Sequence, residues 1–225
     1  MSLFKLEKVS KIYPPYFKAL HNINLRINTG DFVLLTGPTG AGKTTLLKLI
    51  YKEEIPSSGE IFFENKPYSE LQHKDIVKLR QKLGIVFQDL KLFLDLTVYE
   101  NIKISLVLAG KKIKNMKFYI YEFLERFNLA HKAQKKVKEL SGGEQQKVGV
   151  IRALIREPEI LIADEPTGNL DPQSIKEILE IFKELNKNGT TIILATHDPF
   201  ILEQKIGKLI VLSRGEIVKN VEVSW

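Results

Sequence analysis

Residues 37–44 hold the pattern with the most specific chemistry in the chain. They read GPTGAGKT and fit G-x-x-x-x-G-K-[ST], a loop whose backbone amides surround phosphate groups. A helix that starts at the end of such a loop adds a favourable dipole. Lys43 is expected to bridge the β- and γ-phosphates of a nucleotide, and the Thr44 hydroxyl to take one Mg²⁺ position. The candidate nucleotide-binding residues of the loop are Gly37, Pro38, Thr39, Gly40, Ala41, Gly42, Lys43, Thr44 and Thr45.

An acidic pair, Asp164 and Glu165, follows the apolar run Ile160–Ala163. If this run is a strand beside the phosphate loop, Asp164 is placed to hold Mg²⁺ through water or Thr44. Glu165 can then polarise the attacking water as a general base. An acidic pair at the end of a strand is also typical of a simple turn or a helix cap. The intact Glu165 favours a site that hydrolyses its nucleotide.

The run Leu140–Gln146 reads LSGGEQQ and precedes a predicted helix. Ser141 with Glu144 three residues later is typical of a capping box. The exposed helix N-terminus at Ser141, Gly142 and Gly143 is also suited to bind an anion. This segment is far from Lys43 along the chain, so we do not expect it to reach the phosphates held by its own loop.

Two single polar residues follow predicted strands, and each is weak on its own. His197 ends the strand Thr191–Thr196, where an imidazole could contact the γ-phosphate and orient the water, although a lone histidine is more often a core or capping residue. Gln88 ends the strand 85–87, and a glutamine alone indicates nothing.

Apolar runs predict the elements that must position these residues. Phe32–Leu35 is continuous, as expected for a strand buried on both faces. Helical patterns lie between such runs, the clearest at 175–185 with Pro172 as a first helical residue. This alternation predicts a mainly parallel sheet with helices on its faces. Further strands of these kinds are predicted within 2–35 and at 85–87, 160–163, 192–194 and 209–212, with a final hairpin turn at 213–216.

Residues from about 97 to 140 have helical periodicity without buried strands, which predicts an inserted helical lobe within a single domain of residues 1–225. One helix face is predicted to carry Phe118, Tyr121, Leu124 and Phe127.

The net charge of +7 is concentrated in one part of the chain. Residues 111–138 contain nine basic and two acidic residues, 9 − 2 = +7, and the remainder balances at 25 basic and 25 acidic. The segment can be a solvated helical face, or a face held near acidic lipid headgroups or an acidic partner. No nucleic-acid partner is expected, because aromatic residues do not alternate regularly with these lysines. Cysteine is absent, which excludes disulfides and thiolate metal sites, and no apolar run reaches the roughly 20 residues of a membrane span, so we expect a soluble chain.

The motifs together resemble the nucleotide-binding subunit of ABC (ATP-binding cassette) proteins, and the resemblance covers the chain almost from end to end. It implies an α/β fold of the P-loop NTPase class, an ABC-type cassette with a mainly parallel core sheet, an antiparallel β subdomain and an inserted helical lobe. It implies ATP hydrolysis with ATP and Mg²⁺ bound. Gln88 would touch Mg²⁺ and the attacking water, and His197 would contact the γ-phosphate.

The same resemblance implies an ATP-dependent homodimer. Ser141, Gly142 and Gly143 would bind the γ-phosphate held by the other subunit, so two chains would pair head to tail with two ATP molecules between them. Asp171 resembles the family's interface aspartate, although it precedes Pro172 and can be only a helix cap. Tyr13 resembles the aromatic residue that stacks on adenine, with packing on the core as the alternative and Tyr16 as the fallback.

Within the family, the chain is most similar to the FtsE group of bacterial cell-division ATPases. The stretches 35–50, 86–89 and 96–101 carry this likeness, while Lys147 replaces the usual arginine after the LSGGEQQ run. The alternatives are the cassette of a lipoprotein-release or macrolide-type exporter, a nucleotide-gated scaffold and a soluble ABC ATPase.

The FtsE likeness implies an integral membrane permease-like partner, similar to FtsX, and a cytoplasmic location on the inner face of the membrane through that partner. A partner helix would dock between the Gln88 loop and the helical lobe. The segment Leu90–Tyr99 is unusually apolar, which favours either a partner surface or ordinary packing of the lobe on the core.

Overall fold

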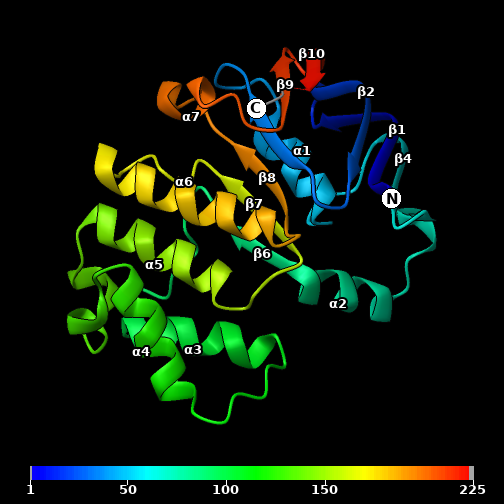
Figure 1. The fold of residues 1–225 in the computed structure, drawn as a ribbon. Helices are drawn as coiled ribbons and strands as arrows, with labels where there is room; N and C mark the ends of the chain where they lie inside the picture. Colours follow the sequence, from blue (N-terminus) through cyan, green and yellow to red (C-terminus); the bar gives the residue numbers. More distant parts are fainter. Residues whose placement is uncertain (1, 223–225) are drawn as a thin grey trace.

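The central element of the fold is a six-stranded sheet. The computed structural model describes residues 2–222, and the strand order of this sheet is β10-β9-β3-β8-β7-β6 (Figure 1). All neighbouring strands are parallel except β10, which pairs antiparallel with β9. Every residue of β7 and β8 is buried, as their continuous apolar sequences predict. The strands are β3 (Phe32–Thr36), β6 (Leu83–Val86), β7 (Ile160–Asp164), β8 (Thr191–Ala195), β9 (Lys208–Ser213) and β10 (Glu216–Glu222).

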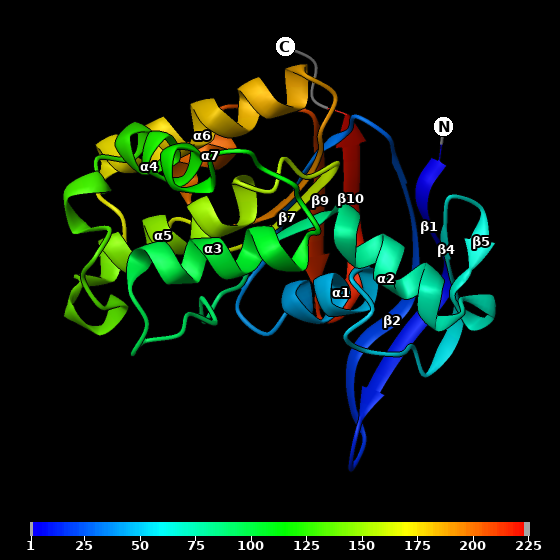
Figure 2. The same cartoon turned by 90° about the horizontal axis from the view of Figure 1, so that it is seen from below.

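A second, antiparallel sheet has the order β2-β1-β4-β5 and lies on one side of the molecule (Figure 2). Helix α1 (Lys43–Ile50) shares one hydrophobic core with this sheet and with β3. Because α1 begins within the phosphate loop, this core holds the loop against both sheets. The strands are β1 (Ser2–Tyr13), β2 (Phe17–Asn28), β4 (Ser58–Phe63) and β5 (Lys66–Pro67).

The helices α3 to α6 lie on the opposite side of the central sheet from the antiparallel strands (Figure 2). They form a second core with the sheet residues Phe32, Leu34, Leu161 and Leu194. The remaining helices are α2 (His73–Lys82), α3 (Val98–Leu108), α4 (Met116–Arg126), α5 (Gly142–Leu154), α6 (Pro172–Lys187) and α7 (Pro199–Glu203), with 3₁₀ turns at Tyr68–Glu70, Ala130–Lys132 and Val137–Glu139.

Local sequence explains where the main helices start. The Thr97 hydroxyl oxygen accepts from the Glu100 amide, and the Glu100 carboxylate accepts from the Thr97 amide. These two bonds form a capping box that starts α3. Pro172 is the first residue of α6, where its missing N–H costs nothing. The fold class predicted from the sequence is confirmed. The boundaries of the helical lobe at 97 and 140 stay a prediction, and residues 98–139 contain α3, α4 and two 3₁₀ turns.

One detail of the predicted lobe is wrong. In α4 the buried residues are Ile120 and Leu124, while the Phe118 side chain is 64% exposed. The helix starts only at Met116, so Phe118 lies in its first turn, at the edge of the lobe. Among residues 2–222, no helix is long and apolar enough to span a membrane.

Candidate active site

The register of the central sheet brings the candidate residues to one edge. Asp164 pairs with Ala195, which also pairs with Leu35, so the carboxyl ends of β7, β8 and β3 are adjacent. The segments that leave these strands carry Glu165, His197 and the phosphate loop. Ligands of parallel sheets bind beyond the carboxyl ends of the strands. The sheet therefore gathers residues that lie far apart in the sequence.

Two glycines of the phosphate loop allow the backbone to approach its neighbours closely. Gly42 has φ +103°, and a Cβ there would lie 2.6 Å from the Ala19 carbonyl oxygen. Gly37 has φ +146°, and a Cβ there would lie 2.1 Å from the Leu212 oxygen. The loop is therefore seated between β2 and β9 in a way that no larger residue permits. Lys43 Nζ donates to the Gly37 carbonyl over 2.8 Å, which places the ammonium group above the loop.

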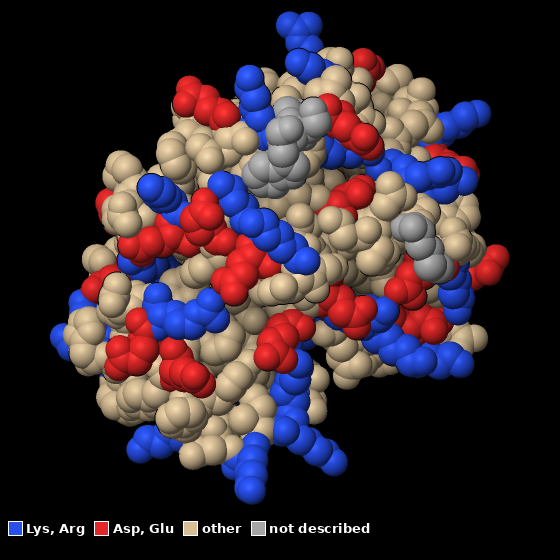
Figure 3. Space-filling view, in the orientation of Figure 1, with Lys and Arg blue, Asp and Glu red and all other residues tan. Residues whose placement is uncertain are grey.

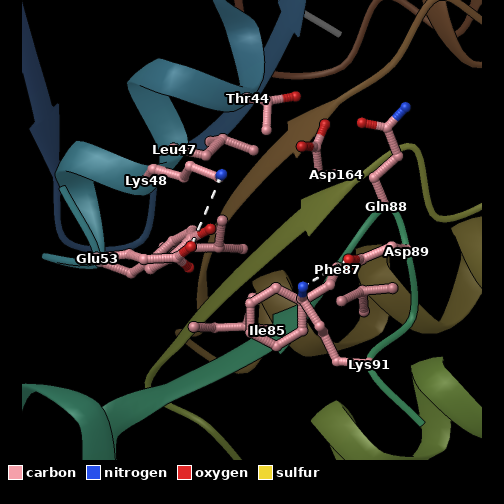
Figure 4. Close-up of a pocket in the computed structure, with 13 residues that line it drawn as sticks. Thr44, Leu47, Lys48, Glu53, Ile85, Phe87, Gln88, Asp89, Lys91 and Asp164 are labelled. Carbon is pink, nitrogen blue, oxygen red and sulfur yellow. Dashed lines mark ion pairs between the residues drawn. The ribbon is translucent and has the colours of Figure 1, made fainter. Parts of the chain in front are cut away.

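Asp164 has the properties of a metal-binding carboxylate. Its side chain is 7% exposed, and Oδ1 is buried without a hydrogen-bond partner among residues 2–222. Burial raises the pKa of Asp164, against a lowering by the Thr44 hydroxyl, and the neighbouring Glu165 raises it further. A buried carboxylate with an unsatisfied oxygen favours a cation at that position. Figure 4 shows Asp164, Thr44 and Gln88 at one end of a cavity of about 350 Å³.

Glu165 and His197 form a hydrogen-bonded pair. Nδ1 of His197 lies 2.8 Å from Oε1 of Glu165, so that a proton on Nδ1 is donated to the carboxylate. The Glu165 side chain is 14% exposed and the His197 side chain 75% exposed. Glu165 has φ +49°, a left-handed conformation, and its amide donates to the Ala195 carbonyl over 2.9 Å. Sequence patterns alone do not show this direct contact between the two predicted catalytic side chains.

Most of the predicted site residues line a second cavity, of about 270 Å³. Its walls come from the phosphate loop, the carboxyl ends of β6 and β7, and the segment after β8. Gly37 and Pro38 do not line it, although both carbonyls accept from Lys43. The lining residues are Phe17, Ala19, Thr39, Gly40, Ala41, Gly42, Lys43, Thr44, Thr45, Gln88, Asp164, Glu165 and His197.

The aromatic residue on this cavity is Phe17 and not Tyr13. Phe17 is 60% exposed and begins β2, directly opposite Tyr13 in the register of β1 and β2. The Tyr13 ring is half-buried, with the Lys11 ammonium 4.9 Å from its centre. Phe17 was missed in the sequence because its position depends on the hairpin register. The only signal in the sequence is an aromatic residue, Phe17, directly after Tyr16.

The Ser141–Gly143 segment does not line either cavity. Ser141 Oγ accepts from the Glu144 amide over 3.3 Å, and Glu144 accepts from the Ser141 amide over 2.9 Å, so the predicted capping box is present. Glu144 also contacts the Lys132 ammonium, which lowers the pKa of Glu144. Ser141 and Gly142 are nevertheless exposed. The start of α5 is therefore open to a ligand from outside the chain.

Asp171 also stands apart from both cavities and caps α6. Its carboxylate accepts from the Ser174 amide over 3.0 Å and from the Ser174 hydroxyl over 2.6 Å, and these bonds lower the pKa of Asp171. A Cβ on Gly143 would lie 3.0 Å from the Asn169 oxygen. The segment before Asp171 therefore packs against the start of α5.

Helix α5 makes two further contacts that the sequence does not predict. The buried Gln146 amide donates to the Glu165 carbonyl over 3.3 Å. One turn and a half later, the Arg152 guanidinium donates to the carbonyls of Leu90 and Lys91, the latter over 2.5 Å. Both of those residues have positive φ. One helix thus links the Ser141 segment, the backbone of Glu165 and the loop after Gln88.

Comparisons with known proteins agree with this arrangement. A family profile described as ABC transporter matches residues 20–168. The cell division ATP-binding protein FtsE of Bacillus subtilis is 40% identical over 218 residues, which cover 97% of this chain and 96% of that protein. FtsE of Escherichia coli K12 is 39% identical over 215 residues, covering 96% and 97%.

Two solved structures of a bacterial ABC transporter cassette, MJ0796, have the same fold. Its dimeric structure has a TM-score of 0.91 at 33% identity, covering 99% of this chain and 100% of that one. A dimeric structure of a post-hydrolysis state bound to ADP and Pi has a TM-score of 0.90 at 33% identity and the same coverage.

Proposed function

This chain belongs to the ABC transporter family as an FtsE-like ATP-binding subunit that hydrolyses ATP, and we propose that it couples ATP-driven dimerisation to an FtsX-like membrane permease. The proposed complex acts in cell division by controlling cell-wall hydrolases outside the membrane. The chain would then be peripheral on the cytoplasmic face of the membrane, held there by its partner.

In the proposed reaction, the phosphate loop and Lys43 hold the triphosphate. Glu165 takes a proton from the attacking water as general base, and His197, bonded to Glu165, keeps that carboxylate oriented and faces the γ-phosphate. Gln88 lines the same cavity and helps to position the water. Adenine would stack at the β1–β2 hairpin, on Tyr13 or on Phe17.

A Mg²⁺ ion fits the donors at this site. Thr44, Asp164 and Gln88 supply oxygen ligands, and the unpartnered Oδ1 of Asp164 is a suitable one. Mg²⁺ prefers few protein carboxylates together with substrate phosphates. When bound, the ion neutralises charge that develops on the phosphates.

We propose that two chains share each ATP. The exposed N-terminus of α5, at Ser141, Gly142 and Gly143, would bind the γ-phosphate held by the opposite chain. Asp171 would lie at the same interface. MJ0796, with its two dimeric structures, supports a dimer for a cassette of this fold.

The observation that carries the membrane-partner proposal is an apolar groove. A cavity of about 400 Å³ opens between β6, α3 and α5, beside the loop after Gln88. Phe93 and Leu108 line it and are 53% and 73% exposed. Within Leu90–Tyr99, Leu92 packs on the core while Phe93 lines the groove. The segment would therefore both hold the lobe against the core and contact the partner.

The rim of this groove is basic and has unmet hydrogen-bonding capacity. Arg80, Lys91 and Arg156 line it together with one acidic residue, Glu53. In the part of the chain that the structure describes, Nε of Arg156 is buried without a partner. An amphipathic helix with acidic residues at its edges would fill the apolar floor and satisfy these donors. A short helix of a permease is the partner that such a groove fits.

The test is co-expression of this chain with an FtsX-like permease and co-purification of the two from detergent-solubilised membranes. Phe93→Glu combined with Leu108→Glu should abolish co-purification while the isolated chain still hydrolyses ATP. Val218→Glu is the matched control, because Val218 is 61% exposed on β10, away from the groove. Unchanged co-purification of the groove variant would refute the docking site. A partner with a large external domain would identify an exporter, and a complex without turnover would identify a scaffold.

A further inference from the structure

The basic residues of segment 111–138 differ in whether they have a carboxylate partner. Near its C-terminal end, Lys132 contacts Glu144 and Lys138 lies 2.7 Å from Asp95. Lys111 pairs with Glu157 over 2.9 Å, and Arg126 lies 3.6 Å from Glu184. Surface ion pairs within the chain therefore account for these four residues. Lys135 and Lys136 are exposed and have no carboxylate partner among residues 2–222, but they lie between the paired residues Lys132 and Lys138.

The lysines between the end of α3 and the start of α4 behave differently. Lys112, Lys114 and Lys117 are exposed, and within residues 2–222 none has a carboxylate partner within ion-pair distance. Residues 101–121 contain five lysines and no aspartate or glutamate. Apart from Lys111, which pairs with Glu157, the lysines of this stretch have no ion-pair partner among residues 2–222. Figure 3 shows Lys and Arg side chains, without Asp or Glu, at the lower end of the molecule, where the α3–α4 connection lies in Figure 1.

Large apolar side chains are exposed among these lysines. Val107, Leu108 and Phe118 are 59%, 73% and 64% exposed. We call residues 107–118 the lysine-rich tip. Free lysines interleaved with exposed aliphatic and aromatic side chains are typical of a surface that meets lipid headgroups, because the charges are attracted to anionic lipids and the apolar groups enter the interface.

The position of the tip fits a membrane contact. Leu108 lies in the tip and also lines the groove proposed for the permease helix. The tip therefore continues the surface that would face the membrane. In this respect alone the inference rests on the proposed function.

We propose that the lysine-rich tip binds the anionic headgroups of the membrane directly, as a second contact besides the permease. Each lysine near an anionic surface strengthens binding about fivefold, so removal of three should weaken it about 100-fold. Salt should weaken the contact as well, because the Debye length shortens.

The experiment is sedimentation of the purified full chain with vesicles that mix phosphatidylglycerol with phosphatidylcholine, in the absence of any permease. The wild-type chain should sediment with these vesicles, and less with phosphatidylcholine alone. The variant Lys112→Gln, Lys114→Gln, Lys117→Gln should lose binding about 100-fold. Phe118→Ser should weaken it without a change in charge.

The matched control removes three exposed lysines from the sheet side of the molecule, by Lys8→Gln, Lys18→Gln and Lys219→Gln. It has the same net charge as the tip variant and should bind vesicles as the wild type does. Equal loss in both variants would overturn the proposal, since net charge alone would then explain binding.

Retained vesicle binding by the tip variant, with loss of co-purification with the permease, would also overturn it and would assign the tip to an acidic protein surface. The single variant Phe93→Glu, which leaves Leu108 and the rest of the tip intact, tests the permease contact separately. Failure of one proposal can thus be told from failure of the other.

Discussion

Replacement of Asp164 by asparagine should stabilise the nucleotide-free chain while it abolishes hydrolysis. Asp164 is 7% exposed, its Oδ1 has no hydrogen-bond partner, and Glu165 follows it directly. Burial raises the pKa of Asp164, so the ionised form is the unfavourable one in the folded chain. Asparagine keeps the shape of the side chain and removes the charge.

The expected gain in stability follows from the cost of burying Oδ1 of Asp164 without a hydrogen bond. A buried polar group without a partner costs about 1–3 kcal/mol, and asparagine should recover roughly half of this. For a domain of this size, 1 kcal/mol corresponds to about 2–4 °C in Tm, so the variant should melt about 1–6 °C higher than the wild type.

The effect has a defined pH dependence. The folded chain holds the Asp164 proton more tightly than the unfolded chain, so the stability from this group is present below the unfolded pKa and lost as pH rises through the folded pKa. The advantage of Asp164→Asn should therefore vanish in acid and reach its full size at neutral pH.

Thermal unfolding without nucleotide or Mg²⁺, followed by circular dichroism, measures this difference. The control is Asp95→Asn, because Asp95 is 81% exposed and its ion pair with Lys138 lies on the surface, so this variant should melt close to the wild type. An Asp164→Asn variant that melts below the wild type at neutral pH would refute the argument.

Three further predictions concern single contacts. Lys43→Ala should weaken ATP binding at least tenfold by titration calorimetry, and unchanged affinity would remove Lys43 from the phosphate site. Gln146→Leu should lower kcat and leave KM nearly unchanged, because it removes the hydrogen bond to the Glu165 carbonyl and touches no substrate. Gln146→Asn should have the same effect if its shorter side chain does not reach that carbonyl. An equal rise in KM would argue against a role of Gln146 in positioning Glu165. Asp171→Ala should lower the stability of the chain through the lost helix cap, and chemical denaturation that shows no loss would contradict that role.

Strands and helix starts could be predicted because their signals are local. The fully buried strands β7 and β8 are continuous apolar runs, and the caps at Ser141 and Asp171 depend on residues within one helical turn. The phosphate loop is recognisable for the same reason, since its glycines, Lys43 and Thr44 are contiguous.

Contacts between distant segments could not be predicted. Phe17 reaches the cavity through the register of the β1–β2 hairpin, and Gln146 meets Glu165 only because α5 packs against the end of β7. The helical period places Phe118 on one face with Tyr121, Leu124 and Phe127, but the start of α4 leaves the Phe118 side chain exposed. The free lysines of the tip could be separated from paired ones only when the positions of Glu144, Asp95 and Glu157 were known.

The proposed mechanism depends most on the sharing of ATP between two chains. The mass of the Glu165→Gln chain in ATP and Mg²⁺ tests this sharing directly. Light scattering should give 2 × 25.8 = 51.6 kDa with ATP and 25.8 kDa without it, because binding is kept while hydrolysis is lost. Addition of Ser141→Arg to this chain should return it to 25.8 kDa with ATP still bound. A Glu165→Gln chain that binds ATP but stays at 25.8 kDa, or a dimer that tolerates Ser141→Arg, would contradict the account.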